Sequence, residues 1–193
     1  MTNETLYLGA NPLNASATAV EGDYVTRDGE SFYRIANVDG MNDFFISVVS
    51  DSNHWMFIST RGGLSAGRTD CDSALFPYYT EDKIRDNSDN TGSRTIVIAD
   101  QGGKRMLWEP FFCSHTGIYR ITRNLYKNVL GDKLIFEETN HDLDLQFSYS
   151  WSTSDRFGFV KQSTIAATGN AESAVEILDG IENLLPYGVL AGT

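Results

Sequence analysis

The chain has 193 residues, of which 15 are lysine or arginine and 26 are aspartate or glutamate, giving a formal net charge of -11 at pH 7. A chain of this length suits one domain with a core of its own. The acidic balance argues against a nucleic-acid partner, whose phosphates need a basic patch, and against binding to an anionic membrane surface.

Short strand-like runs separated by turn residues begin near Glu30. The first 28 residues are weakly patterned, and residues 15–20 fit either a strand or a bound arm. Runs rich in β-branched and aromatic residues then predict strands over 31–38, 43–50 and 54–59, the first of them ending at the turn dipeptide Asp39-Gly40. Their close spacing indicates consecutive antiparallel strands.

Residues 53–92 form the most informative segment. After the strand-like run 54–59 the chain reaches Arg61-Gly62-Gly63 and then shows no sustained period up to Gly92, although it is rich in Gly, Arg, Asp, Tyr and Phe. A connection of this length is seldom a plain surface loop. Long loops that carry aromatic and guanidinium groups are typical of binding surfaces and domain interfaces.

Strand-like runs separated by turn residues resume after this segment. They predict strands over 94–99, 104–109, 117–125, 133–139, 143–151, 157–167 and 173–178, and only 180–185 suggests a short helical turn. The clearest of these is a half-buried strand with the period-two apolar stripe Leu143, Leu145, Phe147, Tyr149 and Trp151. With about ten short strands and no convincing helix, the sequence predicts an all-β fold, an antiparallel sandwich or barrel.

The cysteines and the absence of a targeting signal bear on the compartment. Cys71 and Cys113 do not make a disulfide framework, and Cys113 follows two phenylalanines, which favours a buried apolar role. No signal peptide is visible, and no apolar run approaches the ~20 residues that span a bilayer. We therefore expect a cytoplasmic protein, unless a leader has been removed.

No local pattern points to catalysis or to metal binding. His54, His115 and His141 are the only histidines, and none lies at ligand spacing from another ligand, so we expect no metal and no cofactor. Ser52 with His54, and Ser114 with His115, lack a nucleophile elbow and an acid with a defined place to orient the base.

Asp70 and Asp72 are the one carboxylate pair with suggestive spacing. On extended backbone they would share a face, close enough for their titrations to couple. Two carboxylates flanking a glycosidic bond are the usual hydrolytic arrangement. Acidic pairs in Gly-rich loops more often cap turns or face water, and we favour that interpretation over catalysis.

Guanidinium groups are concentrated in the same segment and directly after it, at Arg61, Arg68, Arg85 and Arg94. Guanidinium groups form bidentate hydrogen bonds with carboxylates and stack on aromatic rings, which Tyr78 and Tyr79 supply. Two interpretations stay open: a loop held by its own ion pairs, or a surface that binds sugar or another domain. The candidate carbohydrate or domain-interface residues are Arg61, Arg68, Asp70, Asp72, Tyr78 and Tyr79, and we predict that Arg61, Arg68 and the two tyrosines lie together on one side of the sandwich.

Two motifs carry a resemblance to a known family. Residues 53–68 (NHWMFISTRGGLSAGR) with 74–84 (ALFPYYTEDKI) resemble the N-terminal domain of cellobiose phosphorylase and of related glycoside hydrolases that have an α/α toroid. Residues 177–188 (ILDGIENLLPYG) resemble the exit from that domain toward the helical linker and toroid. The resemblance runs from about Leu6 to Gly188.

The resemblance implies an antiparallel β-supersandwich similar to the galactose mutarotase-like fold. It also implies that the general acid and the phosphate or water site lie in the toroid, so no catalytic residue is carried over to this chain. Residues 1–193 would then be a single β-sandwich domain, the N-terminal fragment of a longer protein. Its partners would be the C-terminal catalytic domain of the same protein and an oligosaccharide or glycoside, with a homodimer contact as a further option.

Three functional hypotheses follow. The first, which we favour, is a non-catalytic domain of a glycoside hydrolase or glycoside phosphorylase-like enzyme, packing on the toroid and helping to shape its carbohydrate site. The second is an autonomous carbohydrate-binding module in which Trp55, Tyr78, Tyr79 and Trp108 stack on sugar rings. The third is a mutarotase-like sugar isomerase, which would need a histidine and a carboxylate in one concave site.

Overall fold

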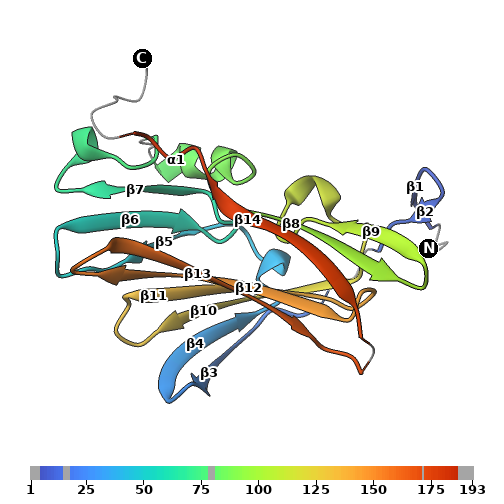
Figure 1. Ribbon diagram of the computed structural model, residues 1–193. Coiled ribbons are helices and arrows are strands. Elements are labelled where there is room, and N and C mark those ends of the chain that lie inside the picture. The colour runs from blue at the N-terminus through green and yellow to red at the C-terminus, as the bar shows by residue number, and fades with distance from the viewer. Residues whose placement is uncertain (1–4, 15–17, 78–80, 171, 187–193) are drawn as a thin grey trace.

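The computed structural model describes residues 5–14, 18–77, 81–170 and 172–186. Within them the protein is all-β and its sheets are antiparallel (Figure 1). The largest sheet has six strands in the spatial order β13-β12-β11-β10-β4-β3. Its strands are β3 (Glu21–Arg27), β4 (Glu30–Ala36), β10 (Ile121–Asn128), β11 (Lys133–Asn140), β12 (Leu145–Ser154) and β13 (Gly158–Ala167).

Two three-stranded sheets make up a second layer, in the orders β14-β8-β9 and β5-β6-β7. Their strands are β5 (Phe45–Val48), β6 (His54–Ser59), β7 (Leu64–Arg68), β8 (Gly92–Gln101), β9 (Lys104–Trp108) and β14 (Ala174–Glu182). A short ladder joins β1 (Tyr7–Leu8) to β2 (Asn11–Pro12). The helical elements are brief: α1 (Glu81–Ile84) and the 3-10 turns η1 (Val38–Gly40), η2 (Cys71–Ser73), η3 (Arg85–Asn87) and η4 (Cys113–His115).

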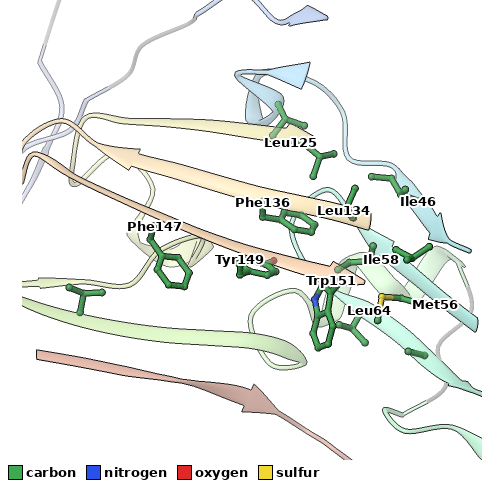
Figure 2. Packing of buried hydrophobic residues seen from close by; sticks show 14 of the residues in the cluster. Ile46, Met56, Ile58, Leu64, Leu125, Leu134, Phe136, Phe147, Tyr149 and Trp151 are labelled. Carbon is green, nitrogen blue, oxygen red and sulfur yellow. The ribbon is translucent and has the colours of Figure 1, made fainter. Parts of the chain in front are cut away.

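One hydrophobic cluster joins the three larger sheets. Alternation along β12 turns Phe147, Tyr149 and Trp151 toward the second layer, where β8 and β9 and the β5-β6-β7 sheet contribute their own buried side chains. Figure 2 shows Trp151 close to Ile58 and Leu64 of that layer. Each fully buried aliphatic or aromatic side chain contributes roughly 1.5–3 kcal/mol, so this shared core holds the layers together as an antiparallel β-sandwich.

The second layer is narrower than the six-stranded sheet. A single row of cross-strand partners on the inner face runs Tyr24, Tyr33, Lys127, Leu134 and Trp151. Leu134 and Trp151 are buried at one end of this row, whereas Tyr24 and Tyr33 are 76% and 43% exposed at the other. The inner faces of β3 and β4 are therefore left partly uncovered.

The opposite edge of the sandwich is closed by an ion pair. Lys161 of β13 donates to the carboxylate of Asp179 in β14 at 2.7 Å, and the hydroxyl of Thr95 donates to the same oxygen at 2.6 Å. Burial alone would raise the pKa of Asp179, but the hydrogen bonds from Lys161 and Thr95 outweigh it and hold that pKa below its usual range. Asp179 is thus an ionised link between the two layers at neutral pH.

The outer face of the six-stranded sheet carries a polar cluster centred on Glu137. Its carboxylate accepts hydrogen bonds from the Tyr126 hydroxyl at 2.6 Å and the Asn124 amide at 3.0 Å, and it pairs with Arg27 at 3.1 Å. Glu137 and Tyr126 are both buried. The cluster therefore ties β3, β10 and β11 together on the side away from the core.

Most predicted strands are confirmed, but four expectations about local structure are wrong. The strand predicted over 31–38 does not pair with the next one along the chain, because β4 lies between β3 and β10 while β5 pairs with β6 in another sheet. The sequence does not predict β3, and it treats 60–92 as wholly irregular, although β7 lies inside that segment. β7 is missed because four small or apolar residues in succession, Leu64 to Gly67, are all buried and leave no alternation to detect. The helical turn expected over 180–185 is also wrong, since Gly180 to Glu182 complete β14 in its ladder with β8.

Packing explains the glycine turn between β6 and β7. Gly62 has a φ of +88°, which other residues adopt at a cost. A Cβ on Gly63 would lie 2.3 Å from the carbonyl oxygen of Ile84 and 2.4 Å from Oδ1 of Asn87. The Asn87 amide also donates to the carbonyl of Leu64 at 3.2 Å, so the segment after α1 is bound closely against this turn.

Both cysteines are free, and Cys113 is half-buried rather than fully buried. Residues 15–17 lie outside the described part of the chain, and residues 18–20 belong to no strand. Among the residues that the structure describes, no helix combines the length and the apolar character needed to cross a bilayer.

Candidate functional site

Three turn regions and one strand surround a pocket of about 210 Å³. We call it the arginine pocket. It is lined by Val38 and Asp39 of η1, Met41, Thr60 and Arg61 of the β6–β7 turn, Phe111, Cys113 and Thr116 of the β9–β10 connection, and Arg123 of β10.

A buried carboxylate on β11 organises one wall of this pocket. Successive residues of the strand predicted over 133–139 face opposite ways. Glu138 accordingly points into the core, where it meets Trp108, while Glu137 points out and pairs with Arg27. Glu138 is 1% exposed and accepts hydrogen bonds from Trp108 Nε1 at 2.8 Å, the Phe111 backbone N–H at 2.8 Å and Arg123 Nε at 2.7 Å. A carboxylate this deeply buried is tolerated only when it is paired and hydrogen-bonded, and here three donors meet that need.

The backbone at Phe111 is held in an unusual conformation. Its φ of +65° lies in the left-handed region, which costs a bulky residue about 1–3 kcal/mol. The hydrogen bond to Glu138 and the edge-on packing of the Phe111 ring on Tyr149, with centroids 5.2 Å apart, hold it there. Strain that the surroundings maintain in this way is typical of functional sites.

The terminal nitrogens of Arg123 are available to donate hydrogen bonds to a ligand in the pocket. Its side chain is 12% exposed and its Nε is bonded to Glu138, while its two terminal nitrogens make no hydrogen bond within the described residues. Burial by itself would lower the pKa of Arg123, but the adjacent Glu138 charge outweighs that effect and raises it. Arg123 therefore stays cationic and is oriented before any ligand arrives.

Arg61 and Asp39 complete the polar lining. Arg61 is exposed on the β6–β7 turn, and its guanidinium has no ion-pair partner in the described part of the chain. Asp39 adds an acceptor, and its charge also helps to stabilise the Arg123 guanidinium. Donors and an acceptor beside the half-buried ring of Phe111 suit a small ligand that carries several hydroxyl groups.

The thiol in this pocket is not set up as a nucleophile. Burial raises the pKa of Cys113, and the nearby Asp89 carboxylate adds to this effect. A thiol with a raised pKa carries little thiolate at neutral pH, and the thiolate is the reactive form.

A second arginine cluster adjoins the pocket. Arg94 donates to Glu109 at 2.6 Å, and its guanidinium lies 4.0 Å from the centroid of the Phe112 ring. The other Glu109 oxygen is 3.2 Å from Nδ1 of His115. Arg94 and its partners thus lie outside the segment 53–92, so this arginine gives no support to a loop held by its own ion pairs, one of the two interpretations left open from the sequence.

Arg61 and Arg68, which the sequence places in one surface, are not brought together. β7 separates them, and its five residues span roughly 16 Å at about 3.3 Å per residue. Arg68 is paired in register with His54 at the far end of the β6–β7 hairpin. Only Arg61 lines the arginine pocket.

Asp70 and Asp72 lie with Arg68 at that far end. Oδ1 of Asp70 accepts a hydrogen bond from the Ser73 N–H at 3.0 Å and caps η2, which is the turn-capping role favoured from sequence. Asp72 is exposed within the same turn. Tyr78 and Tyr79 lie outside the described residues, as does the side chain of Arg85.

The two tryptophans proposed as sugar platforms differ. Trp108 is 2% exposed and bonded to Glu138, so it is part of the core and offers no face to a sugar. Trp55 is half-buried, and its Nε1 donates to the carbonyl of Asp70 at 3.2 Å.

The serine and histidine pairs do not form a triad among the described residues. The Ser52 hydroxyl is 3.3 Å from Nδ1 of His54, whose ring packs on Phe159, and no acidic side chain bonds to His54 there. Nor do any three His, Cys, Asp or Glu side chains within those residues cluster as metal ligands would.

Sequence reasoning did not select Asp39, Phe111, Arg123 or Glu138 as site residues. Aligning the predicted strands around the Gly131-Asp132 turn does not find the Arg123–Glu138 pair either, because it sets Arg123 opposite Asn140, whereas the observed register sets Arg123 opposite Glu138. The convergence of η1 with the β9–β10 connection has no counterpart in the local sequence pattern.

The chain matches no protein-family model and no curated protein. Its function has to be inferred from its own residues.

Proposed function

We propose that this chain is a non-catalytic β-domain of a glycoside hydrolase or glycoside phosphorylase-like protein, and that it binds a saccharide in the arginine pocket. The observation that carries the proposal is the lining of that pocket, where Arg61, Arg123 and Asp39 stand beside the ring of Phe111. Sugar hydroxyls both donate and accept hydrogen bonds, so a pocket lined by one carboxylate and two guanidiniums complements them.

The finer fold is part of the proposal. A six-stranded antiparallel sheet under a smaller layer supports a β-supersandwich similar to the galactose mutarotase-like fold. The motifs at 53–84 and 177–188 support the same assignment, because they resemble the N-terminal domain of that enzyme family.

We propose that the C-terminal catalytic domain of the same protein packs on this domain. The outer face of the β14-β8-β9 sheet supports this, since Leu107 and Leu178 there are 50% and 69% exposed. They are paired in register with Ile98 and Ile96, so the four side chains form an apolar centre on that face. Contiguous apolar surface of this kind is typical of contacts between domains.

Calorimetric titration with a panel of mono- and oligosaccharides tests the binding proposal. Replacing Arg61 with Ala should weaken binding by about tenfold or more, because a hydrogen bond from a charged donor contributes about 1.5–3 kcal/mol. Arg68→Ala is the matched control, since Arg68 is also exposed and lies on the same hairpin, but at the far end. Absence of heat with every sugar, or equal losses in the two variants, would contradict the proposal.

The pair formed by His115 and Glu109, 3.2 Å apart, keeps a mutarotase-like isomerase as the second candidate. A positioned base and acid could move the proton that opens a hemiacetal. Anomer exchange of free sugars, followed by NMR or polarimetry, tests this activity. Acceleration by the wild-type chain that His115→Ala abolishes would favour it, and a rate equal to that of buffer would remove it.

A further inference from the structure

A second and larger concavity, of about 590 Å³, lies where the second layer stops short of β3 and β4. We call it the aromatic groove. It runs between edge strand β5 and the inner face of β3, β4 and β10, and its main lining side chains are Tyr24, Tyr33, Ile35, Phe44, Phe45 and Lys127.

The groove has fixed walls. On one side β5 is anchored at both ends, where the Thr60 N–H donates to the Phe44 carbonyl at 2.9 Å and the Val49 N–H donates to the Gly131 carbonyl at 3.0 Å. On the other side the wall belongs to three hydrogen-bonded strands of the large sheet. A volume of 590 Å³ falls within the roughly 300–1,000 Å³ typical of small-molecule sites, which are mostly preformed.

The aromatic rings in the groove are held in place. Tyr24 and Tyr33 are direct cross-strand partners, with ring centroids 5.2 Å apart at 70°. Tyr33 lies over Gly22, because a Cβ there would come within 2.1 Å of the Tyr33 hydroxyl oxygen. Phe45 is in turn packed edge-on against Phe57 at 5.9 Å.

One charge faces this apolar surface. Lys127 is the only charged side chain that lines the groove, and it has no ion pair or hydrogen bond within the described residues. Other lysines of the same sheet are neutralised, Lys133 by Glu30 and Lys161 by Asp179. In a chain with 26 acidic side chains, an ammonium left unpaired beside aromatic rings is open to an anion that a ligand brings.

We propose that the aromatic groove binds an amphiphilic carboxylate, an aryl or alkyl acid whose apolar body packs on Tyr24, Tyr33 and Phe45 while its carboxylate meets Lys127. A saccharide suits the groove less well, because the apolar lining would leave most of its hydroxyls unpaired. The site shares no lining residue with the arginine pocket, so it stands whether or not that pocket binds sugar.

Matched ligand pairs test the proposal on the purified chain. Titration with 4-phenylbutyrate and 4-phenylbutanol, and with decanoate and decanol below their aggregation limits, varies only the charged head. Each carboxylate should bind at least about tenfold more tightly than its alcohol, given the usual strength of a hydrogen bond between charged groups. Lys127→Gln should remove that preference and Lys127→Arg should keep it.

Two further variants separate charge from shape. Lys104→Gln is the control for charge, because Lys104 is exposed in the β8–β9 hairpin and lines neither pocket. It should leave the preference intact. Gly22→Ala should displace Tyr33 and weaken acid and alcohol alike. Circular dichroism confirms that each variant is folded.

Four outcomes would overturn the proposal. They are equal affinity of the wild-type chain for acid and alcohol, binding of neither, loss of the preference in Lys104→Gln, and a dimer that Lys127→Gln dissociates. The last result would make the groove a contact between copies of the chain.

Discussion

Removing either member of the buried pair formed by Glu138 and Arg123 should destabilise the protein far more than removing an exposed ion pair. Glu138→Leu leaves the Arg123 guanidinium, which is 12% exposed, without its counter-charge. Arg123→Met leaves the Glu138 carboxylate, which is 1% exposed, with hydrogen bonds from neutral donors alone. Breaking one partner of a buried pair typically costs about 3–5 kcal/mol.

The double variant should lose less than the sum of the two single variants. With both charges gone no uncompensated ion remains, and the residual loss comes from the Trp108 Nε1–H and the Phe111 N–H, at about 1–3 kcal/mol each. We therefore expect a favourable coupling between Glu138 and Arg123 of at least about 2 kcal/mol.

Urea unfolding followed by tryptophan fluorescence measures these differences, with the slope checked so that two-state behaviour holds. Arg105→Met is the matched control, because Arg105 pairs with Glu176 at 2.7 Å but the two side chains are 59% and 72% exposed. The control should change stability by no more than about 1 kcal/mol. If Arg123→Met resembles the control, or if the two single losses simply add, the buried pair does not organise this wall of the arginine pocket.

The remaining predictions concern packing and pH. Gly63→Ala should cost about 1–3 kcal/mol, because the new Cβ would meet a backbone carbonyl at 2.3 Å, whereas Gly180→Ala, with nothing within 4 Å, should be neutral or slightly stabilising in the same urea assay. The lowered pKa of Asp179 means that its contribution is present above its unfolded pKa of about 3.9 and is lost as pH falls through the folded value. Wild type should therefore lose more stability than Asp179→Asn between about pH 5 and pH 2, and parallel curves would refute this. Burial, and then the hydrogen bond to Glu137, raises the pKa of Tyr126 to about 12, so stability should fall as pH rises from about 10 through that value. Tyr126→Phe should reduce this loss, while Tyr149 and Tyr119, whose pKa values burial also raises, still contribute to it. The variant should also lack one late tyrosinate step in ultraviolet titration, and an unchanged titration would count against the prediction.

Local patterning was enough to predict much of the sheet structure. Where one face of a strand is buried and the other faces water, apolar and polar residues alternate along the sequence, as they do in β12 from Leu145 to Trp151. The strands predicted over 94–99 and 104–109 form the β8–β9 hairpin, and the glycines between them, Gly102 and Gly103, both have the positive φ that a tight turn requires. β7 escaped detection because strands buried on both faces do not alternate.

The candidate site was predictable only in part. Arg61 was selected because it precedes a glycine pair in a segment rich in arginine and aromatic residues, and the structure places it at the arginine pocket. Its expected companion Arg68 lies elsewhere, because neighbours within one irregular segment become distant once a strand forms between them.

The sequence by itself determined the all-β class, most strand positions and the opposite facing of Glu137 and Glu138, because these depend on backbone period and on neighbouring residues alone. Only the tertiary structure decided that Glu138 collects donors from β9, β10 and the connection between them, and that β3 and β4 extend past the second layer to leave the aromatic groove. Both depend on the order and relative width of sheets assembled from distant segments, and no short-range pattern encodes either.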